Sequence, residues 1–318
     1  MGAVVTEAPL RNDLARGPDG GRAFWVTTAD GLRLRVGHWP GADRGAGKGT
    51  VFLLPGRSEY VEKYGPAAME FAARDYGLIT IDWRGQGLSP RLHADPARGH
   101  LLRFGDFQRD LDALLAQGAA LDLPRPWFVL SHSMGGAIAL RRLMGAHPFR
   151  ACAFSAPMWG VGVPRWLRPW APQLARWLRG GRLSEAYVRG TTAETYVLHA
   201  PFEDNMLTTD ARMWAWLVDQ AGAEPRLALG GPSYQWAAES ILECQALAAL
   251  PSPALPCLTV IGSHERIINT RPVHERMARW PGGRLLVVEG GEHEVMMETP
   301  ARRKRFYDAV AALFDAAR

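Results

Sequence analysis

Short apolar runs and longer stretches of helical periodicity alternate along most of this chain, as expected for alternating strands and helices. Runs of strand type cover residues 50–54, 78–82, 151–155, 258–262 and 284–288, and another begins at Trp127. Two more runs, 23–28 and 32–38, are separated by Asp30-Gly31 and predict a hairpin of edge strands. Helices are expected near 66–74, 104–115 and 237–247, after the run at Trp127, and from about 272 and 300 onward. This alternation predicts an α/β protein with a mostly parallel central sheet and helices on both faces.

The alternation stops after Pro157 and resumes near residue 237. The segment between is rich in Trp, Arg and Pro and contains only short helical pieces, which indicates a helical cap inserted into the sheet domain. We therefore predict a loose N-terminal lead-in at 1–22, a core formed by 23–157 and 237–318, and a cap at 158–236.

The run that begins at Trp127 passes directly into a sequence of helix type, and Ser133 lies on the corner between them. A sharp turn from strand to helix lifts its corner side chain clear of the sheet and requires small neighbours, which Ser131 and Gly135 supply. The pattern is G-x-S-x-G with its first glycine replaced by serine. The alternative is an ordinary buried turn with a serine of no special role.

An acid and a histidine follow this serine in the order that a nucleophile on such a turn requires. Glu265 comes just after the strand at 258–262, and His293 comes just after the strand at 284–288. Serine needs an imidazole to accept its proton, and the imidazole needs a carboxylate to orient it. We therefore predict that Ser133, His293 and Glu265 converge at one edge of the sheet, against the alternative that Glu265 is a surface carboxylate paired with Arg266.

An ester carbonyl attacked by this serine would also need backbone N–H groups to stabilise the negative oxygen that develops. Met134, directly after the serine, is one expected donor, and Arg57, in the loop after the strand at 50–54, is the other.

Other histidines as the base, and a metal-dependent mechanism, agree less well with the sequence than His293 does. His132 belongs to the turn itself and should point away from Ser133, while His264 and His274 precede the last strand. The His-Glu pairs of the chain lack a second histidine four residues on, so no zinc site is predicted. No cofactor motif is expected either.

Composition places the chain among ordinary globular proteins, with 318 residues, 47% hydrophobic and 22% charged. No apolar run approaches the length of a transmembrane helix and no signal peptide is expected, and three cysteines suit a reducing compartment, so we expect a cytoplasmic protein. The formal charge of +5 is carried mainly by arginine, but no nucleic-acid-binding motif accompanies it.

One cap segment combines tryptophan with arginine. On a helical wheel of about 100° per residue, the apolar residues of this segment fall on one side and its arginines on the opposite side. The first side carries Trp166, Trp170, Leu174 and Trp177, and the second carries Arg165, Arg168, Arg176 and Arg179. Pro169 and Pro172 should divide it into two short pieces. We expect the tryptophans to face inward, lining an acyl pocket or packing the cap. The alternative, compatible with the first, is peripheral contact with the anionic inner face of a membrane.

The chain resembles the bacterial lysophospholipase branch of the monoacylglycerol-lipase-like serine hydrolases. The similar segments are residues 55–64, 82–89, 131–136, 205–208 and 230–236, and the resemblance extends from about residue 50 to the C-terminus. It implies an α/β-hydrolase fold and cofactor-free hydrolysis of a carboxylic ester in a lipid with one acyl chain. It also implies that Ser133, Glu265 and His293 are the triad and that Arg57 and Met134 are the oxyanion donors. Pro55 and Ser131 depart from the histidine and glycine usual in the superfamily.

The function predicted from these residues is a serine hydrolase of lysophospholipase or monoacylglycerol-lipase type. The alternatives are a short-chain esterase or thioesterase, an acyltransferase, and a non-catalytic membrane-binding module that retains only the fold. Head group, acyl length and oligomeric state are left open by the sequence.

Overall fold

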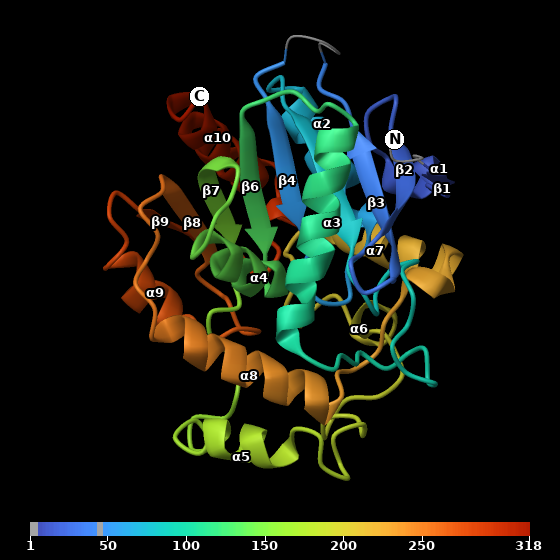
Figure 1. The fold of residues 1–318 in the computed structure, drawn as a ribbon, viewed down its shortest axis with the longest axis vertical. Helices are drawn as coiled ribbons and strands as arrows, with labels where there is room; N and C mark the ends of the chain where they lie inside the picture. Colours follow the sequence, from blue (N-terminus) through green and yellow to red (C-terminus); the bar gives the residue numbers. More distant parts are fainter. Residues whose placement is uncertain (1–5, 43–46) are drawn as a thin grey trace.

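The structure, a computed structural model, describes residues 6–42 and 47–318. Within these residues nine strands form one sheet in the order β1-β2-β3-β5-β4-β6-β7-β8-β9 (Figure 1). The strands are β1 (Thr6–Ala8), β2 (Arg22–Thr27), β3 (Arg33–Trp39), β4 (Thr50–Leu54), β5 (Gly77–Asp82), β6 (Trp127–His132), β7 (Phe149–Ser155), β8 (Cys257–Gly262) and β9 (Arg284–Val288). The pairs β1–β2, β2–β3 and β3–β5 are antiparallel, and the pairs from β5 through β9 are parallel.

The α-helices of the described chain are α1 (Asn12–Ala15), α2 (Gly65–Ala72), α3 (Phe107–Ala120), α4 (Met134–Leu143), α5 (Ala171–Leu178), α6 (Tyr196–His199), α7 (Ala211–Ala223), α8 (Tyr234–Ala248), α9 (Arg271–Met277) and α10 (Pro300–Ala316). Single 3₁₀ turns are η1 (Val61–Tyr64), η2 (Phe104–Asp106), η3 (Pro225–Leu227) and η4 (Val295–Met297).

The central strands are buried on both faces, which explains their continuous apolar runs. In β4, Phe52 and Leu54 join the hydrophobic core under α3 and α4, whereas Val51 and Leu53 join the core under α2 and α10. Figure 1 shows α3 and α4 on the near side of the sheet and α10 behind it. The predicted class, a mostly parallel sheet covered by helices on both faces, is confirmed.

Most predicted elements lie within a few residues of their observed bounds, and β4 and β9 coincide with the predicted runs 50–54 and 284–288. The helix expected at 237–247 begins earlier, at Tyr234, because Ser233 caps it by accepting a hydrogen bond from the Trp236 N–H at 3.1 Å.

The prediction of a loose lead-in at 1–22 is wrong for the part of it that is described. Thr6–Ala8 forms β1, which pairs with β2 and takes the sheet edge, and Asn12–Ala15 forms one helical turn. These short polar elements give little periodic signal, because pairing with β2 rather than an apolar pattern defines β1. Residues 1–5 of the lead-in lie outside the described chain.

Between β7 and α8 the chain leaves the sheet and forms α5, α6, α7 and η3. The tryptophan-arginine segment contains one α-helix, α5, preceded by turns at 165–170, rather than two helical pieces. α5 packs on α8, which separates it from the sheet (Figure 1).

The expectation that the cap tryptophans face inward is wrong. Trp166, Trp170 and Trp177 are 76%, 66% and 69% exposed. The buried residues of α5 are instead Ala171 and Ala175, one helical turn apart. Two small side chains allow α5 to approach α8 closely, so the large apolar residues point away from it. Among the described helices, none has both the length and the apolar character needed to cross a membrane.

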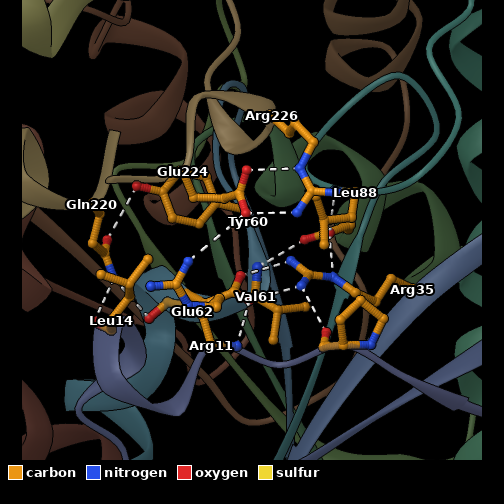
Figure 2. Close-up of polar contacts among 12 residues, drawn as sticks. Arg11, Leu14, Arg35, Tyr60, Val61, Glu62, Leu88, Gln220, Glu224 and Arg226 are labelled. Carbon is orange, nitrogen blue, oxygen red and sulfur yellow. Dashed lines mark hydrogen bonds and ion pairs between the residues drawn. The ribbon is translucent and has the colours of Figure 1, made fainter. Parts of the chain in front are cut away.

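A buried ion triad joins the antiparallel part of the sheet to the loop after β4. Arg35 of β3 donates to both carboxylate oxygens of Glu62 and to Asp82 of β5, each at 2.7 Å, and all three side chains are fully buried (Figure 2). Asp82 also accepts hydrogen bonds from the backbone N–H groups of Val61 and Leu88, both at 2.7 Å. The triad therefore fixes η1 against the sheet.

Replacing Arg35 by Met leaves two buried carboxylates without their cation, so the free energy of unfolding should fall by about 3–5 kcal/mol. Urea denaturation followed by tryptophan fluorescence measures this change. Asp13→Asn, at the exposed pair of Arg11 and Asp13, is the control and should leave the transition midpoint unchanged. Equal stability of Arg35→Met and wild type would contradict a structural role for the triad.

Candidate active site

Ser133 occupies a backbone conformation that non-glycine residues rarely adopt, with φ 47° and ψ −117°. Such a conformation costs about 1–3 kcal/mol and persists only where its surroundings enforce it. Here the Ser133 N–H donates to the Ser155 carbonyl at 3.0 Å, and the Ser133 carbonyl accepts from Gly136 and Met158, each at 2.8 Å. The turn between β6 and α4 is thus held on both sides.

The backbone of this turn lies close to the end of β4, as the small residues around Ser133 predicted. A Cβ added to Gly135 would lie 2.2 Å from the Leu54 carbonyl oxygen, so only glycine fits. Ser131, in the place of the first glycine, is fully buried, and its hydroxyl has no hydrogen-bond partner in the described chain.

Glu265 and His293 meet at the carboxyl ends of β8 and β9. His293 Nδ1 lies 2.6 Å from Glu265 Oε2, and both side chains are almost fully buried. Glu265 Oε1 accepts from the Ile267 and Ile268 N–H groups at 2.7 and 3.1 Å. Burial alone would raise the pKa of Glu265, but His293 and these backbone donors outweigh it and lower the pKa, which keeps the carboxylate ionised.

The alternative role for Glu265, a surface carboxylate paired with Arg266, is wrong. Arg266 pairs with Asp204 at 2.8 Å and with Glu292 at 3.3 Å. Of the rival histidines, His264 and His274 are exposed, whereas His132 is buried and its Nδ1 lies 3.1 Å from the Ser155 carbonyl oxygen.

Ser133 and His293 line one cavity of about 700 Å³, together with Arg57, Met134 and cap residues. Within the described chain, the Ser133 hydroxyl makes no hydrogen bond to His293. Hydrogen bonds of this kind are often long in ligand-free enzymes and shorten when substrate binds. The structure thus brings the predicted serine and histidine to one cavity and joins the histidine to the predicted acid.

The loop after β4 approaches the Ser133 turn closely, since a Cβ added to Gly56 would lie 3.0 Å from Ser133 Cβ. Among the described residues, the backbone N–H groups of Arg57 and Met134 have no hydrogen-bond acceptor. Both groups are therefore unpaired within the described chain, and both residues line the cavity with Ser133.

A buried cluster of charges that the sequence analysis missed lies beneath the site. Lys63 donates to Glu59 and Glu294, while His132 Nε2 lies 3.2 Å from Glu294 Oε1 and 3.5 Å from Glu59 Oε1. Glu59 also accepts from the Gly56 N–H and the Tyr64 hydroxyl. The cluster therefore contacts the loop of Arg57 and the residues directly beside Ser133 and His293.

Burial disfavours charge in this cluster, but its members stabilise one another. The carboxylates of Glu294 and Glu59 outweigh burial and raise the pKa values of Lys63 and His132. Against the same burial, His132 and Lys63 hold the pKa of Glu294 well below its usual range. Glu59, His132 and Glu294 could offer ligand atoms within 4.8 Å of one another to a metal, but the ammonium of Lys63 already supplies the positive charge between the two carboxylates.

The cap contacts the His293 loop through its backbone. The His293 N–H donates to the Met206 carbonyl at 3.2 Å, and the Glu294 N–H donates to the Leu207 carbonyl at 2.8 Å. Asn205 shapes this segment by accepting from the N–H groups of Leu207 and Thr208, both at 2.9 Å. The position of the histidine therefore depends on the cap as well as on β9.

A mostly parallel sheet whose strand-to-helix turn presents a serine is the architecture of the α/β-hydrolases, and this chain has their fold. The model of the family described as serine aminopeptidase S33 matches residues 45–300, and the chain belongs to that family.

Known relatives agree with a hydrolase. Lysophospholipase L2 of Escherichia coli K12 is 35% identical over 281 residues, which cover 84% of this chain and 80% of the relative. A soluble variant of monoglyceride lipase from Saccharomyces cerevisiae, solved with a substrate analogue, has a TM-score of 0.69 at 20% identity, covering 92% of this chain and 94% of that one. Monoacylglycerol lipase of Paleococcus ferrophilus has a TM-score of 0.68 at 16% identity, covering 90% and 99%.

The charge cluster predicts how stability depends on pH. The raised pKa of His132 means that its imidazolium stabilises the folded chain fully below the unfolded pKa of about 6.5. This stabilisation is lost as pH rises through the folded pKa. The melting temperature should therefore fall as the pH rises above about 6.5, and His132→Gln should flatten that slope.

Differential scanning fluorimetry across this pH range tests the prediction, with His274→Gln at an exposed histidine as the control. Parallel slopes for wild type and His132→Gln would show that folding does not raise the pKa of His132.

Proposed function

We propose that this protein is a serine hydrolase that cleaves the carboxylic ester of a lipid with a single acyl chain, of lysophospholipase or monoacylglycerol-lipase type. The observation that carries the proposal is the contact of His293 with the buried carboxylate of Glu265, together with the lining of one cavity by His293 and Ser133. The names of the relatives, lysophospholipase L2 and monoglyceride lipase, point to the same substrate class.

In this mechanism Ser133 attacks the ester carbonyl and forms an acyl-enzyme. His293 accepts the serine proton at Nε2 and later delivers it to the leaving alcohol, while Glu265 at Nδ1 fixes the tautomer and stabilises the imidazolium. The N–H groups of Arg57 and Met134 stabilise the developing oxyanion. Water then releases the fatty acid by the same route.

The cavity suits one acyl chain. Its volume of about 700 Å³ is in the range of small-molecule sites, and much of its wall is aliphatic. The apolar lining includes Met158, Val161, Val197, Met206, Leu207, Leu217, Ile267 and Ile268. Burial of a fatty acyl chain there would supply binding energy of about 0.8 kcal/mol per methylene.

Ser133→Ala should lower ester hydrolysis by roughly four to six orders of magnitude, because the nucleophile is lost. It should also abolish labelling by a fluorophosphonate probe, which intact-mass spectrometry detects. Ser131→Ala, in the same turn, should still be labelled, since its hydroxyl bonds to nothing in the described chain. Labelling of the Ser133→Ala protein would refute the assignment of the nucleophile.

We also propose that the cap contacts an anionic membrane surface through its exposed tryptophans and the arginines beside them. Trp177 of α5 and Trp166 and Trp170, in the turns that precede α5, are all exposed. Tryptophan favours the lipid interface, and arginine is attracted to anionic head groups. This contact would place the cap at the source of a membrane-derived substrate.

Arg165 and Arg168 should each contribute about 1 kcal/mol to binding of anionic vesicles. The double variant Arg165→Gln/Arg168→Gln should therefore bind about tenfold to thirtyfold more weakly to phosphatidylglycerol-containing vesicles in co-sedimentation. Added salt should also weaken binding of the wild type, because it screens the attraction between arginine and the anionic head groups. Equal wild-type binding to neutral and anionic vesicles would contradict the proposal.

A further inference from the structure

Arg57 is a cation at the substrate cavity for which the described chain provides no carboxylate. Arg57 is one of the residues that line the cavity. In its side chain, one Nη donates to the Gly230 carbonyl and the other lies 3.0 Å from Ser58 Oγ. Its guanidinium carbon lies 5.3 Å from the centre of the Trp236 ring. The Nε is buried and has no hydrogen-bond partner among the described residues. A guanidinium has five N–H donors, so several remain for a ligand.

Other buried cations of the described chain are neutralised or satisfied. Arg35 is held by Glu62 and Asp82, and Lys63, which also lines the cavity, is held by Glu59 and Glu294. Burial without a carboxylate partner lowers the pKa of Arg57 to about 10, which still leaves it cationic at neutral pH. A buried charge is costly unless it is paired. An anion that enters the cavity would supply the partner that Arg57 lacks.

We infer that the Arg57 guanidinium binds the phosphate of a lysophospholipid head group and thereby selects this substrate over a neutral monoacylglycerol. The inference rests on the proposed function and assigns its substrate class. Guanidinium and phosphate match in charge and in bidentate hydrogen-bond geometry.

The covalent lengths are compatible with this contact. The proposed oxyanion donor is the backbone nitrogen of the same residue, so the ester carbonyl lies at the base of the Arg57 side chain. From that nitrogen to Cζ of arginine there are as many bonds as from the ester carbonyl carbon to phosphorus in a 1-acyl lysophospholipid. The chain that links ester and phosphate is therefore long enough for the phosphate of an ester bound at the backbone N–H to reach the guanidinium.

The test compares two soluble substrates with one acyl chain in common, 1-octanoyl-glycero-3-phosphocholine and 1-octanoylglycerol. The measured quantity is the ratio of their kcat/KM values. Wild type should prefer the phospholipid, and Arg57→Met should lower the ratio about tenfold to a hundredfold, as expected for lost hydrogen bonds to a charged group. Arg57→Lys, which keeps the charge but not the fork, should restore part of the ratio.

Arg91→Met is the matched control. Arg91 is also an arginine without a carboxylate in the described chain, and it donates to the carbonyls of Arg226 and Ala228, in the cap segment that Arg57 contacts at Gly230. Arg91 does not line the cavity. Its replacement should leave the substrate ratio unchanged, even if the cap is destabilised.

The outcomes separate this inference from the proposed function. Equal losses on both substrates in Arg57→Met would overturn the inference and leave the hydrolase intact, with Arg57 as a structural support of the cap. A wild-type preference for 1-octanoylglycerol would overturn it as well. Failure of wild type to hydrolyse either lipid would instead refute the proposed function.

Discussion

The ammonium of Lys63 lies between the carboxylates of Glu59 and Glu294, and three segments of the candidate site depend on this interaction. Glu59 holds the Gly56 N–H and so positions the loop of Arg57. Glu294 is covalently joined to His293 and contacts His132, the neighbour of Ser133. In a buried environment the attraction between opposite charges offsets the free-energy cost of removing them from water. If one charge is removed, the remaining charges stay buried without that compensation, and the fold is destabilised. The site is therefore held by charge balance beneath it as well as by the strands.

Two consecutive residues of η1 link this cluster to the rest of the fold. Glu62 is bound by Arg35 of β3, whereas Lys63 reaches the site. Gln220 of α7 donates to the carbonyls of Leu14 and Glu62, which ties the cap and the N-terminal segment to the same turn (Figure 2). Displacement of η1 would thus disturb the sheet, the cap and the loop of Arg57 together, which gives the buried Arg35 triad a consequence for activity as well as for stability.

Features that depend on local sequence patterns could be predicted, whereas most features that depend on contacts between separate segments of the chain could not. β4 was predictable because burial on both faces leaves a continuous apolar run. β9 is only partly buried, at the edge of the sheet, and was predictable from its run of Leu and Val. The meeting of Glu265 with His293 was predictable because parallel strands end at one edge. β1 was missed because three residues without an apolar pattern form it, and it is stabilised by pairing with β2. The outward tryptophans were missed because a helical wheel gives the two sides of α5 but not which one packs on α8, a choice that Ala171 and Ala175 decide. The Lys63 cluster joins residues far apart in the chain, each ordinary in its local sequence.

The two groups of charge at the cavity have different consequences for a ligand. Lys63 lies between Glu59 and Glu294, and His132, whose pKa these carboxylates raise, contacts both, so the charges on the floor of the cavity are paired with one another. Arg57 has no carboxylate partner in the described chain. Its own backbone N–H is the group that is proposed to face the reacting carbonyl. The guanidinium without a carboxylate partner and the backbone N–H proposed to bind the ester carbonyl therefore belong to the same residue. An anionic group at a fixed covalent distance from the ester would complete the charge balance, whereas a neutral glycerol would leave the guanidinium desolvated and incompletely bonded. The proposed role of Arg57 would therefore favour substrates in which the ester and the negative charge belong to one small molecule.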